Sequence, residues 1–253
     1  MVNKRIDPRA QSIEIRANTK REFFLVHGYS GGSKTLEELA RFLNKEFNAT
    51  VRIIRLKGHG QTIEELNKYD YYDFLNQIER EIKKDIKKKE IIIGGLSMGG
   101  CFALDIAARY PVKGVFIISP VYKTNLLFTL LTLLEPLIIK KNWKKPMRGV
   151  QEILDVGGFA YPQIPIKGLK IVKQAEKRLN FLLPKISCPC LLLSPLKEPI
   201  VHEKSTDVLI KSIGSKRKRV IKYKNKNGHA LILSEYKKDV FNKIRYFFKE
   251  TFT

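Results

Sequence analysis

The sequence of 253 residues predicts an α/β fold, in which a mainly parallel central sheet is covered by helices on both faces. Two observations lead to this prediction. Short apolar runs alternate along the chain with longer segments whose apolar residues recur at helical spacing. The apolar runs contain almost no polar residues, as is typical of parallel strands that are buried on both faces.

Local patterns justify each element in turn. Glycine-rich turns follow several apolar runs directly, as at Gly28 and Gly94, and mark the ends of predicted strands. The helix after the first strand is opened by Thr35 and Glu38, which have the spacing of a capping box. In chain order we expect strands at 23–26, 51–54, 91–94, 114–119, 189–194 and 220–223, and helices at 35–47, 71–86, 101–110 and 235–249.

The interval 121–187 interrupts this alternation. Its pattern indicates helices and no strand, so we expect an inserted helical cap on a core formed by residues 1–120 and 188–253. The most apolar window of the cap, 126–139, is shorter than the roughly 18 to 20 residues that a membrane-spanning helix needs. No transmembrane segment is therefore expected.

Basic residues outnumber acidic ones by 48 to 25, which gives a net charge of +23. The surplus is spread over core and cap, and its densest runs, 87–89 and 216–219, precede apolar runs, where solvated loops are expected. We expect no specific nucleic-acid site, while weak, salt-sensitive contact with an anionic membrane or a polyanion stays open. The polar N-terminal segment and the three cysteines favour a cytoplasmic location.

The most specific motif is Gly95-Leu96-Ser97-Met98-Gly99, which lies between a predicted strand and a predicted helix. In that context the G-x-S-x-G pattern indicates a nucleophile elbow, a sharp turn that exposes a serine hydroxyl above the sheet edge. Ser97 is therefore the candidate nucleophile. The Met98 amide, at a helix N-terminus, can stabilise an anion. The alternative is an ordinary loop whose serine caps the helix.

A serine hydroxyl is a poor nucleophile unless a base removes its proton, so the motif predicts a catalytic histidine. His229 lies between the last predicted strand and the last predicted helix and is the candidate base. His27 and His59 lie in glycine turns, where we expect them to bond to the backbone. His202 is expected to be exposed.

A carboxylate between Ser97 and His229 is needed to orient the imidazole and to stabilise its charged form. Glu198 follows the predicted strand at 189–194 and is the favoured candidate. Asp207 lies in the following helical pattern and is the alternative.

These motifs, with His27-Gly28-Tyr29-Ser30-Gly31 and Lys57-Gly58-His59-Gly60, resemble the α/β-hydrolase superfamily, in particular the bacterial carboxylesterases related to monoacylglycerol lipases. The resemblance covers roughly residues 20–120 and 187–250. It implies the α/β-hydrolase fold. It also implies that the Tyr29 amide forms an oxyanion hole with the amide of Met98. The family usually has aspartate at the position of Glu198.

Two other functions fit parts of the sequence. Residues 28–35 nearly match the phosphate-binding pattern G-x-x-x-x-G-K-[ST], but Ser33 replaces the second glycine and no apolar strand ends in aspartate. Nucleotide hydrolysis is therefore not favoured. The other function is non-catalytic: a hydrolase-fold protein that binds polyanions or anionic membrane through its basic surface.

The favoured interpretation is a serine hydrolase that cleaves short- to medium-chain acyl esters or monoacylglycerols through an acyl-enzyme intermediate. Ser97, Glu198 and His229 form its expected triad, and no cofactor or metal is expected. The leucines of 126–139 favour an apolar acyl substrate, because we expect them to line the acyl pocket and pack on the core. Alternatively they contact anionic lipid together with the lysine-flanked Trp143.

Overall fold

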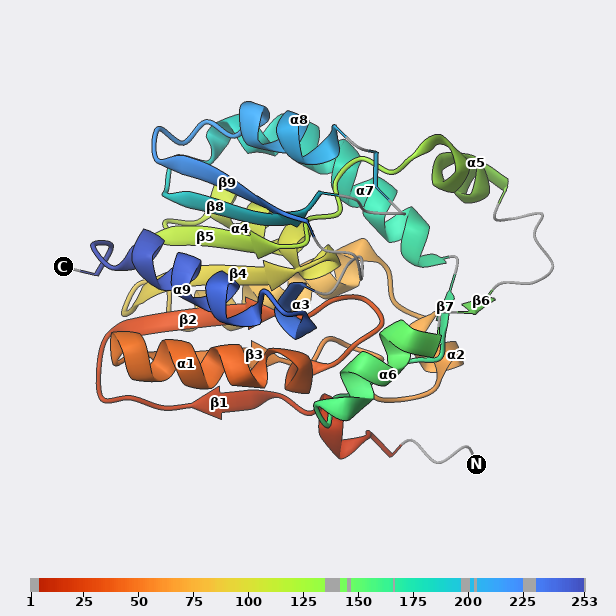
Figure 1. Ribbon diagram of the computed structural model, residues 1–253, viewed down its shortest axis with the longest axis horizontal. Helices are drawn as coiled ribbons and strands as arrows, with labels where there is room; N and C mark the ends of the chain where they lie inside the picture. Colours follow the sequence, from red (N-terminus) through yellow and green to blue (C-terminus); the bar gives the residue numbers. More distant parts are fainter. Residues whose placement is uncertain are drawn as a thin grey trace.

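The computed structural model describes residues 5–134, 142–144, 147–165, 167–196, 201–202, 204–224 and 231–252. Within these residues, seven strands form the central sheet in the order β1-β3-β2-β4-β5-β8-β9 (Figure 1). Every neighbouring pair is parallel except β1 with β3. The strands are β1 (Ile13–Ile15), β2 (Arg21–Val26), β3 (Thr50–Ile54), β4 (Glu90–Leu96), β5 (Gly114–Ile118), β8 (Cys190–Pro195) and β9 (Lys218–Tyr223).

The apolar runs predicted as strands are all confirmed, whereas β1 was not expected. Its three residues, Ile13, Glu14 and Ile15, are too few to show a convincing alternation in the sequence. They form a strand because β3 offers an unpaired edge, to which β1 adds in antiparallel register.

Helices cover both faces of the sheet (Figure 1). One face packs against α1 (Glu37–Phe47) and α9 (Lys237–Phe248). The other face packs against four helices: α3 (Tyr71–Lys83), α4 (Met98–Arg109), α7 (Lys167–Leu182) and α8 (Ser205–Ser212). Successive strand residues serve opposite layers, since Phe24 belongs to the core beneath α3 and α4 and Phe23 to the core beneath α1 and α9.

The predicted capping box at Thr35 and Glu38 is wrong. Residues Ser33–Leu36 form a 3₁₀ turn, so Thr35 already lies in helical backbone and α1 begins after Leu36 without a side-chain cap. The capping box that does form opens α3. There the Asp70 carboxylate accepts from the Asp73 amide at 3.1 Å, and the Asp73 carboxylate accepts from the Asp70 amide at 3.0 Å.

The interval between β5 and β8 contains strands as well as helices. Besides α5 (Leu126–Leu134), α6 (Met147–Asp155) and α7, it holds β6 (Asn142–Lys144) and β7 (Gln163–Pro165), which pair antiparallel. The expectation of no strand is therefore wrong, because each strand is too short to give a pattern of its own. Elements α5, β6, β7 and α6 lie beyond the carboxyl ends of the sheet strands (Figure 1). Among the described helices, none is long and apolar enough to cross a membrane.

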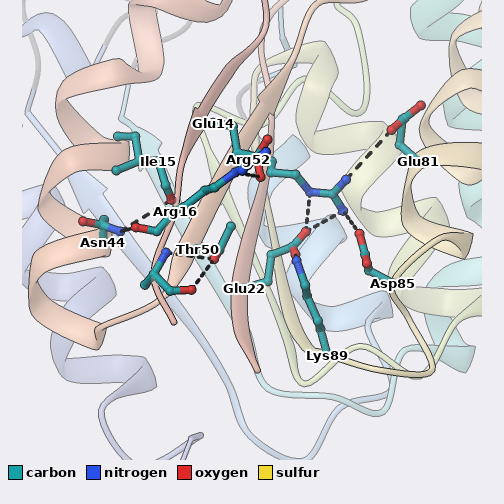
Figure 2. A network of polar contacts seen from close by, with 11 residues as sticks. Glu14, Ile15, Arg16, Glu22, Asn44, Thr50, Arg52, Glu81, Asp85 and Lys89 are labelled. Atoms are coloured by element: carbon teal, nitrogen blue, oxygen red, sulfur yellow. Dashed lines mark hydrogen bonds and ion pairs between the residues drawn. The ribbon is translucent and has the colours of Figure 1, made fainter. Parts of the chain in front are cut away.

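A charged network joins strands β2 and β3 to the end of α3 (Figure 2). The Glu22 side chain is fully buried near the amino end of β2, where Arg52 Nε donates to it at 2.7 Å and Lys89 Nζ at 2.6 Å. Arg52 also pairs with Asp85 at 2.9 Å. A buried carboxylate is costly unless it is paired, so this end of the sheet depends on Arg52.

We expect Arg52→Met to lower the free energy of unfolding by about 3 kcal/mol, because it leaves Glu22 buried with one cation fewer. Urea denaturation followed by circular dichroism measures the change. Arg16→Met is the matched control, because its pair with Glu14 has an arginine side chain that is 83% exposed, and exposed pairs contribute little. Equal denaturation midpoints for the two variants would contradict a stabilising role of the network.

Candidate active site

The turn between β4 and α4 has the strained backbone of a nucleophile elbow. Ser97 has φ 57° and ψ −122°, in a region that residues with a Cβ rarely adopt. Gly95 and Gly99 permit the turn: a Cβ on Gly95 would lie 2.3 Å from the Gly99 carbonyl oxygen, and a Cβ on Gly99 would lie 2.2 Å from that of Val26. The glycines are therefore required by close backbone packing, as the sequence motif predicts.

Ser97 does not act as a helix cap. It occupies the N-cap position of α4, yet its side chain makes no capping hydrogen bond, and the residue is partly exposed. The alternative interpretation as an ordinary capping serine is thus wrong. Met98 is the first residue of α4, so its amide belongs to the helix N-terminus, where backbone N–H groups favour negative charge.

The loop that follows β2 lies directly beside Ser97. A Cβ built on Gly28 would lie 3.5 Å from the Cβ of Ser97 and 4.0 Å from its Oγ. Tyr29 is the next residue after Gly28. Its side chain is buried and packs against α7, where a Cβ on Gly168 would lie 2.4 Å from the Tyr29 ring.

Two histidines contact backbone carbonyls of the same loop. His27 and His59 are completely buried and contact backbone, which confirms the expectation for both. The Leu56 amide donates to His27 Nε2 at 3.2 Å, so His27 donates from Nδ1 to the Gly28 carbonyl at 2.9 Å. His59 Nε2 lies 2.6 Å from the Tyr29 carbonyl.

Burial keeps both imidazoles neutral. Loss of solvation lowers the pKa of His27 to about 3, with His59 as a further cause, and lowers the pKa of His59 to about 4. A neutral imidazole has a single N–H. In His59 we assign that proton to Nε2, because its contact with Tyr29 is shorter than the 3.1 Å contact of Nδ1 with the Lys57 carbonyl.

Glu198 and His229 lie outside the described residues, so their side chains are not placed. The strands that precede them are described. The carboxyl ends of these strands are aligned, since Leu96 of β4 pairs with Ile118, Ile118 with Leu193, and Pro195 with Tyr223. Because the strands are parallel, β8 and β9 end at the same end of the sheet as β4, where the elbow lies.

The other two candidates, Asp207 and His202, lie within the described residues. Asp207 is in the first turn of α8, and its carboxylate pairs with Lys222 Nζ of β9 at 2.6 Å. His202 is exposed, as expected.

Sequence reasoning missed Tyr161, whose hydroxyl donates to the Gly58 carbonyl at 3.0 Å and whose amide donates to the Ser30 carbonyl at 3.1 Å. No local pattern signals it, because it reaches the loop from the interval between β5 and β8.

Known proteins resemble this chain over most of its length. A family model described as serine aminopeptidase, S33, matches residues 17–156. A thermostable monoacylglycerol lipase of Bacillus sp. strain H-257 is 26% identical over 210 residues, which cover 79% of this chain and 80% of that protein. A carboxylesterase of Bacillus subtilis strain 168 is 22% identical over 224 residues, or 83% of this chain and 85% of that one.

The fold has a clear counterpart among solved structures. A metagenome-derived lipolytic enzyme superposes with a TM-score of 0.83 at 20% identity, over 97% of this chain and 100% of that chain. This likeness confirms the α/β-hydrolase fold expected from the motifs.

The backbone strain at Ser97 predicts a difference in stability between two variants that lack the Ser97 hydroxyl. Ser97→Gly and Ser97→Ala both remove the hydroxyl, but only glycine adopts this conformation without a Cβ penalty. After the loss of backbone entropy that glycine brings, we expect Ser97→Gly to be more stable by about 1 kcal/mol in thermal unfolding. An alanine variant of equal or greater stability would contradict the strained turn.

Proposed function

Since the chain belongs to the family described as serine aminopeptidase, S33, and has the α/β-hydrolase fold, we propose that it is a serine hydrolase that cleaves carboxylic esters. The observation that carries the proposal is the strained Ser97 turn beside the Tyr29 loop. Two relatives whose names state ester substrates, a monoacylglycerol lipase and a carboxylesterase, support esters as the substrate class. The proposed substrates are short- to medium-chain acyl esters or monoacylglycerols.

The reaction proceeds in two acyl-transfer steps. Ser97 Oγ attacks the ester carbonyl carbon while His229 takes the hydroxyl proton, and the amides of Tyr29 and Met98 bind the resulting oxyanion. Collapse of the tetrahedral intermediate breaks the bond to the alcohol, which receives the proton from His229. Water then attacks the acyl-enzyme by the same route and releases the carboxylic acid. Glu198 orients the imidazole and stabilises its charged form.

Glu198 is the better candidate for the acid. The Asp207 carboxylate pairs with Lys222 at 2.6 Å and lies in the first turn of α8. A carboxylate that is already paired with a lysine is a weaker partner for an imidazolium. Glu198 follows β8 by three residues in the sequence, and β8 ends at the same end of the sheet as β4, which leads into Ser97.

Helix α5 supports contact with lipid. We expected the leucines of 126–139 to line the acyl pocket and pack on the core. Residues 135–139 lie outside the described residues, and none of the nine residues of α5 is buried, so α5 is not part of the core. Leu126 is 73% exposed and Leu133 is 71% exposed. In a chain of net charge +23, an exposed apolar helix suits weak contact with an anionic membrane or with aggregated substrate.

The proposed location is the cytoplasm. The three cysteines are free thiols, and Cys101 and Cys190 are buried. Free cysteines are typical of a reducing compartment.

Ester turnover tests the proposal most directly. We expect the protein to hydrolyse p-nitrophenyl esters of short to medium acyl length and to be labelled by a fluorophosphonate. Ser97→Ala should abolish labelling and lower turnover roughly a thousandfold or more, because it removes the nucleophile.

Ser119→Ala is the matched control for this experiment. Ser119 also has a positive φ, 53°, and follows the neighbouring strand β5. The Ser119→Ala variant should keep both fluorophosphonate labelling and ester turnover. Salt-sensitive binding of a polyanion without labelling would instead favour the non-catalytic function, and faster turnover of aminoacyl p-nitroanilides than of esters would contradict the substrate class.

Replacement of each candidate acid by its amide tests which of the two belongs to the triad. We expect Glu198→Gln to lower kcat roughly a thousandfold or more, because the neutral amide no longer stabilises the imidazolium. Asp207→Asn should keep nearly full turnover. Steady-state kinetics with p-nitrophenyl butyrate measures both, and the reverse order of losses would assign the role to Asp207.

A further inference from the structure

Two buried histidines contact the Tyr29 loop, and the proposed reaction assigns no step to either of them. The rings of His27 and His59 lie edge to face with centroids 4.7 Å apart. Neither has exposed surface, and each donates a hydrogen bond to a carbonyl of residues 28–29. The cost of burying two imidazoles suggests that these two contacts matter to the site.

The His27 contact controls the direction of the Tyr29 amide. The Gly28 carbonyl and the Tyr29 N–H belong to the same peptide group, which is planar and trans, so they point in opposite directions. The hydrogen bond from His27 Nδ1 to the Gly28 oxygen, at 2.9 Å, therefore fixes where the Tyr29 N–H points. It also polarises the peptide group, and a polarised amide is a stronger donor. The Leu56 amide holds the other ring nitrogen at 3.2 Å.

The His59 contact fixes the next peptide group. Its Nε2 donates to the Tyr29 carbonyl at 2.6 Å. The peptide groups on both sides of the Tyr29 Cα are thus each held by an imidazole. Since both φ and ψ of Tyr29 depend on these groups, the amide cannot rotate without breaking at least one of the two hydrogen bonds.

We propose that His59 and His27 are positioning residues, which hold the two peptide groups flanking Tyr29 and thereby aim its amide at the oxyanion. The inference rests on the proposed function, because it assumes that the Tyr29 amide stabilises a developing negative charge. The surroundings favour this role. Phe74 and Tyr161 pack on His59 with ring centroids at 5.6 Å and 6.5 Å, and hydrogen bonds are stronger in such a water-excluded site.

Two substitutions at position 59 separate positioning from packing. His59→Gln keeps an N–H donor near the position of Nε2, whereas His59→Leu keeps apolar volume without a donor. We expect His59→Leu to lower kcat for p-nitrophenyl butyrate about tenfold to a hundredfold with KM nearly unchanged, because a misaimed donor acts in the transition state. His59→Gln should recover most of that loss.

Tyr161→Phe is the control in the same cluster. It keeps the ring beside His59 and removes only the hydroxyl, which bonds to the backbone of residues 58–61 and not to residues 28–29, so its kcat should stay near that of the wild type. If His59→Leu does not fold, the same comparison is made at position 27, where His27→Asn keeps a donor near Nδ1 and His27→Leu does not.

Hydrogen–deuterium exchange gives a readout that does not need catalysis. Amide exchange in residues 28–31, followed by mass spectrometry, should be faster in His59→Leu than in wild type, His59→Gln and Tyr161→Phe. Equal loop exchange and equal kcat in the leucine and glutamine variants would overturn the inference. A wild type without Ser97-dependent ester turnover would instead overturn the proposed function, and the exchange data would still show whether the histidines order the loop.

Discussion

The first turn of α4 packs so closely on β2 that no side chain fits between them. A Cβ at Gly99 would lie 2.2 Å from the carbonyl oxygen of Val26, the last residue of β2. This backbone contact places the strained Ser97 turn beside the loop that continues from β2, whose Gly28 borders Ser97. Ser97, the start of α4 and the Tyr29 loop are therefore brought together by backbone packing, which explains why glycine occupies position 99.

The two ends of β2 carry different kinds of buried polar groups. Near its amino end, the buried carboxylate of Glu22 is neutralised by Arg52 and Lys89. At its carboxyl end, the buried groups are His27 and the neighbouring His59, which loss of solvation keeps neutral. Neutral donors hold the loop peptides without adding charge near the proposed oxyanion. Charged pairs thus stabilise the end of the sheet that lies away from the proposed chemistry.

The sequence predicted most of the fold, because long apolar strands and amphipathic helices carry strong local patterns. The elbow at Ser97 and the backbone-bonded histidines were also predictable, since glycine spacing reflects close packing. The prediction of a capping box at Thr35 was wrong because Thr35 belongs to a 3₁₀ turn that precedes α1. Strands β1, β6 and β7 and the contacts of Gly168 and Tyr161 were missed, because they arise from tertiary pairing rather than local pattern. The roles of Glu198 and His229 stay predictions, since both lie outside the described residues.

The central claim is that Ser97 carries the acyl group between two half-reactions. Rapid-quench kinetics with a p-nitrophenyl ester, followed by mass spectrometry of the digested protein, measures this intermediate directly. We expect a burst of p-nitrophenol equivalent to one acyl group per chain and an acylated peptide that contains Ser97. Turnover without a burst and without an adduct, or an acyl group on another residue, would contradict the account.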